Sequence, residues 1–368
     1  MSASTPSRPR IPPAFVLRAA EVLRRALIDL ADRLVPAELA LLEHVTGGAT
    51  AVGLHTVARL GIADTIGEGS KTARELASTM DVDATTLHRV LRQLASVGVF
   101  TIDGEGRFSN NRLSTVLRTK LPSNSIRGFV EFIGGPPAIK ALTMFEHSMT
   151  TGESAFDRSH GKTLWEHFAE HPDQGALFAQ GMSEITQLSA PYVAAAYPFG
   201  ELRTVCDVAG GRGMLLAEIL VQHPGVRGAL FDADYVLDCA TPFLEERGVL
   251  DRVERLVGNF FERIPEGYDA YLLKDILHDW DDARCDTILG SCRRAMQPGG
   301  KLLIVENLLE DTQITPPVPT LDILMLVMTT GGLQRSVNQF RALLAQSGFR
   351  LERVLTTPAI DIVEAIAI

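Results

Sequence analysis

A glycine-rich turn follows an apolar, β-rich run in the second half of the chain. The run 204–208 leads into the letters DVAGGRG (207–213), and a helical pattern begins directly afterwards. Glycines let a backbone turn sharply and let a ligand lie against it, which indicates a nucleotide-type site. A dinucleotide fingerprint counted from Gly211 would need its third glycine at Leu216, so that match fails. The carboxylate of Asp207 suits a cationic ammonium or sulfonium ligand and disfavours a pyrophosphate.

A second carboxylate, Asp232, closes the next apolar run, 228–231, and stands 19 positions after Gly213 (232 − 213). A carboxylate in this position can accept hydrogen bonds from both hydroxyls of a ribose. Taken singly, Asp207 and Asp232 are each more typical of a turn or a helix cap. Together, at two strand ends with a glycine turn between them, they favour an adenosine site.

A histidine, His278, lies just past the run 270–273, within the letters KDILHDWDD (274–282). At the carboxyl end of a strand it would lie where a substrate meets a cofactor. An imidazole with an ordinary pKa of about 6.5 suits removal of a phenolic proton near neutral pH. A lone histidine is more often structural, and the other histidines suggest no chemistry. Glu306, directly after the run 301–305, is the candidate to hold the imidazole in the useful tautomer.

The elements that must position these residues are five β-rich runs separated by helical patterns, at 204–208, 228–231, 253–257, 270–273 and 301–305. This alternation predicts an α/β fold with a parallel, doubly wound, Rossmann-like sheet. Ligands of such sheets bind beyond the carboxyl ends of the strands. The glycine turn, Asp232 and His278 are therefore expected at one edge of the sheet.

The N-terminal third has the pattern of a winged helix. Thr72 can cap a helix over 73–80, a short turn leads to a second helix that Gly98 ends, and the letters DGEG (103–106) indicate a hairpin. A winged helix either binds DNA or serves packing and dimerisation. Residues 72–108 carry four Arg against five acidic residues, whereas a groove binder needs a basic footprint. We therefore expect a dimerisation module.

Further helices flank the winged-helix pattern. An amphipathic helix is expected over 15–34, with its arginines on a solvated face and an apolar face that needs a partner surface. Pro36 ends it, and a second helix is expected over 38–45, before the glycine pair 47–48. We divide the chain into a flexible N-terminus, a mostly helical winged-helix dimerisation domain, a helical connector and a catalytic domain, at 1–13, 14–124, 125–195 and 196–368.

The composition is that of an ordinary globular protein, with 46% hydrophobic and 22% charged residues. The formal net charge of −10 repels polyphosphate backbones and argues against a nucleic-acid partner. No apolar stretch has the length of a signal-peptide core or of a membrane span. The four cysteines lack paired spacing, and no His or Cys cluster has metal-ligand spacing. We expect a cytoplasmic protein with reduced thiols, no metal and no membrane association.

Several short motifs accompany the winged-helix start and the glycine turn. They are Phe178 to Ser183, Phe231-Asp232, Gly258 to Phe261, Leu277 to Trp280, Pro298 to Gly300, Asp322 to Met325, and Gly331-Gly332 before Arg335. With them the chain resembles the S-adenosylmethionine-dependent O-methyltransferases of the caffeic acid and bacterial natural-product type, over nearly its whole length. The resemblance implies S-adenosyl-L-methionine as methyl donor, S-adenosyl-L-homocysteine as product, and a homodimer in which each subunit helps to close its partner's active site.

The resemblance also implies which residues bind the cofactor. They lie in the glycine turn, at strand ends and on one connector helix: Met182, Ser183, Asp207, Ala209, Gly210, Gly211, Gly213, Asp232, Asn259, Phe260 and Lys274. The glycine turn would hold the methionine part of the cofactor. Asp232 would bind the ribose, and Asn259 with Phe260 would bind the adenine.

The same resemblance makes His278 the catalytic base, with Glu306 as its orienting partner and Gln334 at the place of a second acidic neighbour. The acceptor pocket would be apolar and suited to a flat aromatic molecule, although its residues are equally suited to the core. Its residues are Phe129, Phe132 and Met325.

Three residues depart from the family pattern. Ala209 replaces a glycine, so we expect the turn to approach the cofactor less closely. Asn259 replaces an aspartate, and its amide would bond the adenine more weakly. Gln334 replaces a glutamate, which weakens the support for a charged His278.

The sequence therefore predicts an O-methyltransferase that acts on a hydroxyl of a small phenolic or polyketide-type aromatic molecule, in natural-product and antibiotic biosynthesis. One alternative keeps the scaffold and the cofactor but catalyses hydroxylation or decarboxylation of an aromatic polyketide. The presence of His278 argues against it. A second alternative is a ligand-sensing transcription regulator, which the acidic charge balance disfavours.

Overall fold

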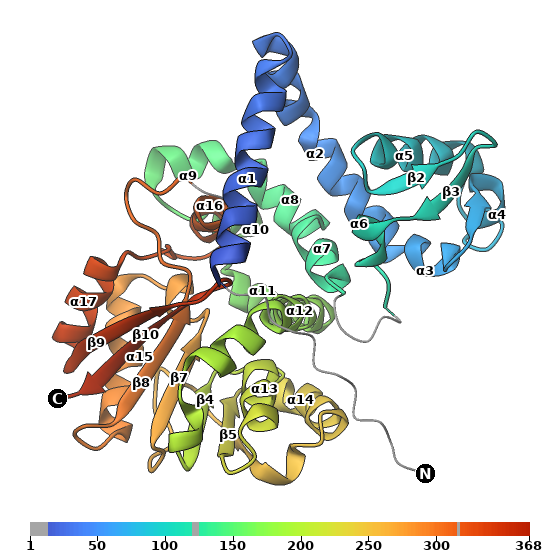
Figure 1. Cartoon of the computed structure of the whole chain (residues 1–368). Helices are drawn as coiled ribbons and strands as arrows, with labels where there is room; N and C mark the ends of the chain where they lie inside the picture. The colour runs from blue at the N-terminus through green and yellow to red at the C-terminus, as the bar shows by residue number, and fades with distance from the viewer. Residues whose placement is uncertain (1–13, 120–124, 315–316) are drawn as a thin grey trace, which may run out of the picture.

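The computed structural model describes residues 14–119, 125–314 and 317–368. A pair of long helices, a small winged-helix unit, a group of connecting helices and a large sheet follow one another along the chain (Figure 1). The prediction made for residues 1–13 falls outside the described residues. None of the described helices is long and apolar enough to cross a membrane.

Two long helices begin the described chain, α1 (Ala14–Arg33) and α2 (Ala37–Arg59), and they project together from the rest of the molecule (Figure 1). The prediction that the second helix ends before the glycine pair 47–48 is wrong, because α2 continues through it. A glycine inside a helix costs about 1 kcal/mol relative to alanine. Tertiary packing further along α2 offsets this cost: a Cβ added to Gly134 would lie 2.8 Å from the carbonyl oxygen of Ala51.

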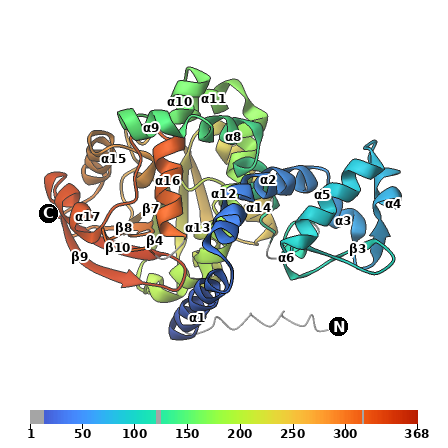
Figure 2. The same cartoon turned by 90° about the horizontal axis from the view of Figure 1, so that it is seen from above.

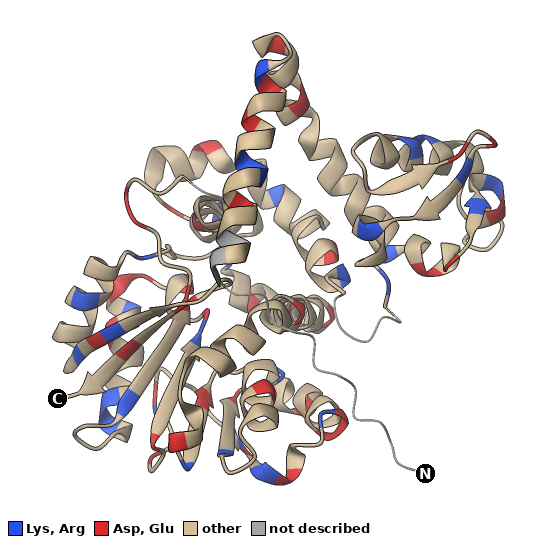
Figure 3. Ribbon diagram, viewed as in Figure 1, with Lys and Arg blue, Asp and Glu red and all other residues tan. Residues whose placement is uncertain are grey.

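The winged-helix prediction is confirmed. Thr72 and Glu75 form a capping box, in which the Thr72 N–H donates to Glu75 Oε2 at 2.6 Å. Three short strands pair in the antiparallel order β1-β3-β2. Acidic and basic side chains both lie on this unit (Figure 3), which stands apart from the large sheet (Figure 2). Its elements are α3 (Ile62–Ile66), β1 (Ser70–Thr72), α4 (Ala73–Ala77), α5 (Ala84–Ser96), β2 (Phe100–Ile102), β3 (Arg107–Asn110) and α6 (Arg112–Thr115).

The connector is helical, as expected. Its helices are α7 (Arg127–Ile133), α8 (Pro136–Leu142), α9 (Phe145–Thr151), α10 (Ala155–His160), α11 (Leu164–Glu170) and α12 (Pro172–Ala196). Helices α7 and α12 cross where glycines leave room for close approach. A Cβ on Gly181 would lie 2.9 Å from the backbone of Phe129, and a Cβ on Gly128 would lie 2.9 Å from the Gln180 side chain. This crossing holds Phe129 against the helix that carries the predicted cofactor residues Met182 and Ser183.

The catalytic domain is built on a seven-stranded sheet in the order β6-β5-β4-β7-β8-β10-β9. The strands are β4 (Thr204–Val208), β5 (Arg227–Asp232), β6 (Val253–Val257), β7 (Ala270–Lys274), β8 (Lys301–Glu306), β9 (Phe349–Thr356) and β10 (Asp361–Ala367). The first five are parallel and confirm the five predicted runs, whereas β9 and β10 form an antiparallel edge that the sequence reading missed. Strand order reverses between β4 and β7, which is where ligands bind in such sheets.

Helices cover both faces of this sheet, as a doubly wound fold requires. One core packs α12, α13 and α14 against the sheet, and the other packs α15 and α17 on the opposite face. Helix α16 instead packs with the connector helices α8 and α10. The helices of this domain are α13 (Met214–Gln222), α14 (Asp234–Glu246), α15 (Asp282–Ala295), α16 (Val318–Met328) and α17 (Val337–Gln346).

Candidate active site

The glycine turn connects β4 to α13 in an unusual backbone conformation. Ala209 has a φ of 56°, in the left-handed region that disfavours a side chain, and its N–H donates to the carbonyl of Phe231 at 2.8 Å. Gly210 packs directly on Asp207, since a Cβ at this position would lie 2.5 Å from the Asp207 Oδ2 atom. The turn therefore needs a glycine at position 210. The backbone of Ala209 is strained by its positive φ, at a position where the sequence resemblance implies a glycine.

Asp232, at the end of β5, binds the glycine turn through hydrogen bonds. Its Oδ2 atom accepts the N–H of Gly211 at 2.9 Å, and its Oδ1 atom accepts the N–H of Ala233 at 2.7 Å. Burial raises the pKa of Asp232 to about 6, while these two N–H groups oppose the rise. Sequence reasoning correctly placed Asp232 beside the turn, and the structure adds that it shapes the turn.

Asp207 lies beneath the turn and is almost completely buried. Among the described residues, neither of its carboxylate oxygens has a hydrogen-bond partner. Burial, followed by the charge of Asp232, raises the pKa of Asp207 to about 7, while Lys274 opposes this rise. A buried carboxyl without partners is costly unless a ligand supplies them. The two carboxyls therefore fit a ligand that combines a cationic group with ribose hydroxyls, as S-adenosylmethionine does.

The predicted adenine residues follow β6. Asn259 Oδ1 accepts the N–H of Phe261 at 3.0 Å, and Asn259 Nδ2 donates to Glu262 at 3.1 Å. The amide thus caps its own turn, and its remaining hydrogen-bonding capacity is free for a ligand. The Phe260 ring lies beside the Phe261 ring, with centroids 4.7 Å apart.

Lys274 ends β7 on the other side of the glycine turn. Its ammonium group pairs with Asp275, and the Lys274 side chain is mostly buried. Burial opposes ionisation of Asp275, but Lys274 and His278 together hold its pKa below the ordinary value. The other predicted cofactor residues, Met182 and Ser183, lie on α12.

His278 lies in a short turn, Leu277–Asp279, directly after β7. Glu306, at the end of β8, accepts three backbone N–H groups of this turn on its Oε1 atom, from Ile276 at 3.2 Å, Leu277 at 2.7 Å and His278 at 3.2 Å. The structure shows no hydrogen bond between Glu306 and the imidazole among the described residues, and the buried Oε2 atom of Glu306 has no hydrogen-bond partner there. The orienting role expected of Glu306 stays a prediction.

Gln334 makes the contact with the ring that was expected of Glu306. The amide nitrogen of Gln334 lies 2.9 Å from His278 Nδ1. On the other side of the ring, Asp279 Oδ1 lies 3.6 Å from His278 Nε2. The imidazole is therefore held between an amide and a carboxyl group.

Carboxyl groups dominate the electrostatics of the imidazole. Burial lowers the pKa of His278, but Asp279, Glu306 and Asp275 together outweigh it, so the pKa is raised above its ordinary value. Burial also raises the pKa of Asp279 to about 7, which His278 opposes. Such an imidazole is a stronger base than a free one, and its conjugate acid is stabilised by its neighbours.

The three predicted acceptor residues lie on two helices. Phe129 and Phe132 are on α7, and Met325 is on α16. The Phe132 ring packs edge-on against Phe178, with centroids 5.2 Å apart. An aromatic chain continues from Phe178 through Trp165 to Trp280, with centroid distances of 5.7 Å at both steps.

This chain connects the predicted pocket to the turn of His278, because Trp280 follows that histidine by two positions. Sequence reasoning missed Trp165, since nothing in its helix distinguishes it from a core residue. The sequence motif that includes Arg335 gave no role to this residue, which the structure buries beside the turn.

Comparisons with known proteins agree with this geometry. The O-methyltransferase domain model matches residues 144–350, and the O-methyltransferase dimerisation domain model matches residues 42–120. The chain is 40% identical over 332 residues to a phenazine O-methyltransferase of Lysobacter antibioticus, covering 90% of this chain and 96% of that protein. It is also 40% identical over 312 residues to a mitomycin biosynthesis 6-O-methyltransferase of Streptomyces lavendulae, covering 84% and 88%.

One solved structure adds the ligands. An O-methyltransferase from neocarzinostatin biosynthesis, in complex with S-adenosyl-L-homocysteine and 1,4-dihydroxy-2-naphthoic acid, has a TM-score of 0.75 and 31% identity, covering 87% of this chain and 96% of that one. The family model places the winged-helix unit in a dimerisation domain. The chain belongs to the O-methyltransferase family, and it is an O-methyltransferase that uses S-adenosylmethionine.

Proposed function

We propose that His278 is the general base that removes a proton from the hydroxyl of a small aromatic acceptor as that oxygen receives the methyl group. The observation that carries the proposal is the position of His278. The imidazole follows β7 at the edge of the sheet that also holds the glycine turn. Its Nδ1 atom lies next to Gln334, and its Nε2 atom lies nearer to Asp279. A positioned base typically contributes a factor of roughly 10² to 10⁴ in rate.

The cofactor would be held by the residues around the glycine turn. When bound, S-adenosylmethionine supplies the methyl group from a sulfonium centre. Asp207 would meet the cationic amino acid part, and Asp232 the ribose, because both carboxyl groups are buried at the turn. Asn259 and Phe260 would flank the adenine. The rest of the cofactor pocket would be lined by Met182, Ser183 and Lys274.

The hydrogen bond at Nδ1 decides which imidazole nitrogen is the base. For His278 Nε2 to accept a proton, Nδ1 must carry one and donate it. Gln334 Oε1 is buried and has no partner among the described residues. Turning the amide by half a rotation brings this oxygen to Nδ1–H, so that the oxygen gains a partner and Nε2 becomes free to accept. Asp279, on the Nε2 side, then stabilises the imidazolium.

The acceptor is proposed to be a flat aromatic natural product of the phenolic or polyketide type. The aromatic side chains of Phe132, Phe178 and Trp165 support this, since they pack together beside α16 and the turn of His278. The relatives support it as well, because the solved enzyme from neocarzinostatin biosynthesis binds 1,4-dihydroxy-2-naphthoic acid, a flat aromatic molecule with hydroxyl groups, and another relative is named for mitomycin biosynthesis. We infer a role in antibiotic biosynthesis on the same ground.

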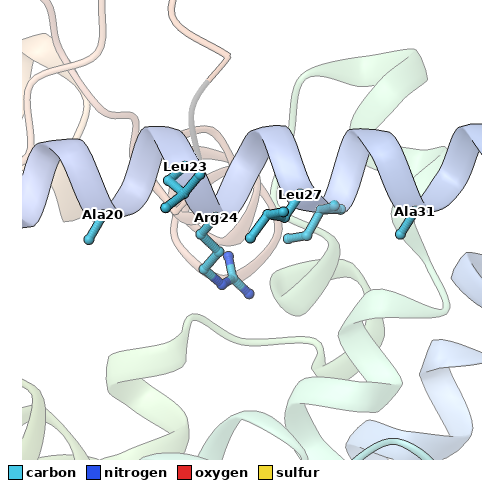
Figure 4. Close-up of a pocket in the computed structure, with 6 residues that line it drawn as sticks. Ala20, Leu23, Arg24, Leu27 and Ala31 are labelled. Atoms are coloured by element: carbon cyan, nitrogen blue, oxygen red, sulfur yellow. The ribbon is translucent and has the colours of Figure 1, made fainter.

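We infer that the dimer forms through α1 and α2. Leu23, Leu27 and Leu30 of α1 are 54 to 60% exposed, which is unusual for an apolar helix face. Figure 4 shows Leu23 and Leu27 projecting from α1 beside Ala20, Arg24 and Ala31, on one open and mostly apolar face of the helix. A second copy of this chain would cover this face. A cytoplasmic location is proposed from the four free cysteines, three of which are buried as thiols.

The test uses purified protein, S-adenosylmethionine with a labelled methyl group, and a panel of phenols. Label should appear on an acceptor oxygen with the parent, and His278→Ala should lose roughly 10² to 10⁴ in turnover on a weakly acidic phenol. Calorimetry with S-adenosyl-L-homocysteine should show that the mutant still binds cofactor. Parental turnover by His278→Ala would refute the base, and a hydroxylated or decarboxylated product without label would refute methyl transfer to oxygen.

A further inference from the structure

The segment that follows α16 wraps closely around the turn of His278. The N–H of Leu333 donates to the carbonyl of His278 at 2.9 Å. A Cβ on Gly332 would lie 2.5 Å from the same carbonyl oxygen, and a Cβ on Gly331 would lie 2.9 Å from Asp281. The two glycines therefore permit a close contact with the turn Leu277–Trp280, here called the base turn, that no larger residue allows.

Arg335 belongs to this segment, and its side chain is only 1% exposed. Its Nη1 atom donates to the carbonyl of Leu277 at 2.8 Å, and its Nη2 atom donates to the carbonyl of Trp280 at 2.8 Å. Its Nε and Nη2 atoms both donate to Asp282 Oδ1, at 3.1 and 2.8 Å. One planar guanidinium thus fixes the carbonyls on both sides of His278.

Glu306 fixes the same turn from the opposite side. It accepts the N–H groups of residues 276–278, whereas Arg335 binds the carbonyls of Leu277 and Trp280. The charge of Arg335 also opposes the upward shift that burial imposes on the pKa of Glu306. The backbone N–H groups of the turn are therefore held by the carboxylate of Glu306, and its backbone carbonyl groups by the guanidinium of Arg335.

We propose that Arg335 is a positioning residue for methyl transfer, which holds the Leu277–Trp280 turn so that His278 meets both Gln334 and the acceptor. The inference rests on the proposed role of His278 as base. A buried guanidinium is costly, and apolar residues of similar volume often serve stability as well or better. Arg335 binds the turn that carries His278, and it directly follows Gln334, which contacts the imidazole. This position gives the buried guanidinium a function. Lysine cannot reproduce the role, because a single ammonium lacks the planar fork that spans two carbonyls.

The experiment compares Arg335→Lys and Arg335→Met with a matched control, Arg293→Met. Arg293 also donates to two backbone carbonyls, of Met296 and Ile368, but on α15 and away from the turn of His278. Each variant is assayed on two acceptors, a weakly acidic phenol from the panel and a nitro derivative of it that is ionised at the assay pH. An ionised acceptor needs no base, so a loss confined to the weakly acidic phenol reports on His278.

We expect Arg335→Met to lose about 10²-fold in kcat on the weakly acidic phenol and less than about threefold on the ionised one, because a small misplacement of a catalytic group is costly. KM and the affinity for S-adenosyl-L-homocysteine should stay near parental values. Arg335→Lys should be intermediate, and Arg293→Met parental. Equal losses on both acceptors, or a parallel loss of cofactor affinity, would show a merely structural role and overturn the inference.

His278→Ala, run alongside, separates the two proposals. If it loses turnover while the Arg335 variants match the control, the inference is wrong and the proposed base stands. If it keeps parental turnover on the weakly acidic phenol, the base is wrong and the inference fails with it. Should Arg335→Met not fold, Asp282→Asn provides the second variant, since it removes an anchor of the guanidinium through a side chain that is 78% exposed. It should lose about three- to tenfold on the weakly acidic phenol alone.

A measurement without turnover completes the design. The imidazole of His278 can be titrated by NMR with histidine labelled at Cε1, and its signal identified by its absence from His278→Ala. In Arg335→Lys the midpoint should fall toward that of an exposed imidazole, because the ring loses its fixed distance to Asp279. A midpoint identical to the parent's would overturn the inference whatever the turnover shows.

Discussion

Gln334→Glu is the substitution that tests the chemistry of the imidazole most directly. The amide of Gln334 lies 2.9 Å from His278 Nδ1 and can either donate or accept there. A carboxylate can only accept, so it fixes the proton on Nδ1 and leaves Nε2 as the base. At this distance an opposite charge interacts with the imidazolium by about 6 kcal/mol at an effective dielectric constant of about 20. Burial of the new carboxylate offsets part of this energy. We expect the pKa of His278 to rise further, by about one to two units.

The sign of the pH effect follows from the protonation state that is active. Only the neutral imidazole takes a proton, so turnover falls as the pH drops through the pKa of His278. A raised pKa moves this acidic limb to higher pH. On the plateau above it, turnover should rise, because the base is stronger and a single tautomer is populated.

The assay is the pH profile of kcat on a weakly acidic phenol, for the parent, Gln334→Glu and the control Gln346→Glu. Gln346 is exposed at the end of α17, so its substitution should leave the profile unchanged. Binding of S-adenosyl-L-homocysteine verifies that each variant is folded. An acidic limb that stays in place, or moves to lower pH, would refute the reasoning. It would show that the added carboxyl takes up the proton itself in a neighbourhood already crowded with acids.

Three further predictions concern the cofactor and the dimer. Asp232→Ala should weaken S-adenosyl-L-homocysteine binding by about 1.5 to 3 kcal/mol in calorimetry, the usual worth of charged hydrogen bonds, and unchanged affinity would remove Asp232 from the site. Because the pKa of Asp207 is raised to about 7 and that of Asp232 to about 6, the parent's affinity for the same ligand should fall by up to about tenfold between pH 7 and pH 6, whereas Asp207→Asn should show no such fall in this range. Leu27→Glu should yield monomers by light scattering at micromolar concentration, whereas Met149→Glu, at a position that is also exposed but on α9, should not; a Leu27→Glu dimer would contradict the proposed interface.

Local patterns account for the part of the fold that the sequence predicted well. Four of the five parallel strands, β4, β5, β7 and β8, are mostly buried because helices cover both of their faces, whereas β6 is a largely exposed edge strand. The winged helix carries its own caps at Thr72 and Asp83. β9 was missed because only its first residue is fully buried, so it resembles a solvated segment. The continuation of α2 through Gly47 and Gly48 depends on packing against distant residues, which propensity alone does not report.

The site was predictable in its location and less so in its contacts. Asp207, Asp232 and His278 lie at or just after the carboxyl ends of three strands that are neighbours in the sheet, β4, β5 and β7, a position that the order of strands determines. The contacts of Glu306 with the backbone and of Gln334 with the imidazole depend on how the turn of His278 folds over β8, which brings together residues far apart in sequence. Arg335 was recognised only as the residue that ends a glycine motif, and its burial was not predicted because arginines are mostly exposed.

The carboxyl groups at this edge of the sheet form two groups with different roles. Asp207 and Asp232 lie at the glycine turn, where they would meet the cationic amino acid part and the ribose of S-adenosylmethionine. Asp275, Asp279 and Glu306 surround His278, where the acceptor's proton places a positive charge after transfer. Because the second group raises the pKa of His278, the proton leaves the acceptor more readily and stays on the imidazole. Removing a carboxyl from the first group should therefore weaken cofactor binding. Asp279→Asn should instead lower kcat and shift the acidic limb of the pH profile of kcat to lower pH. If that limb does not move in Asp279→Asn, the two groups of carboxyls do not have these separate roles.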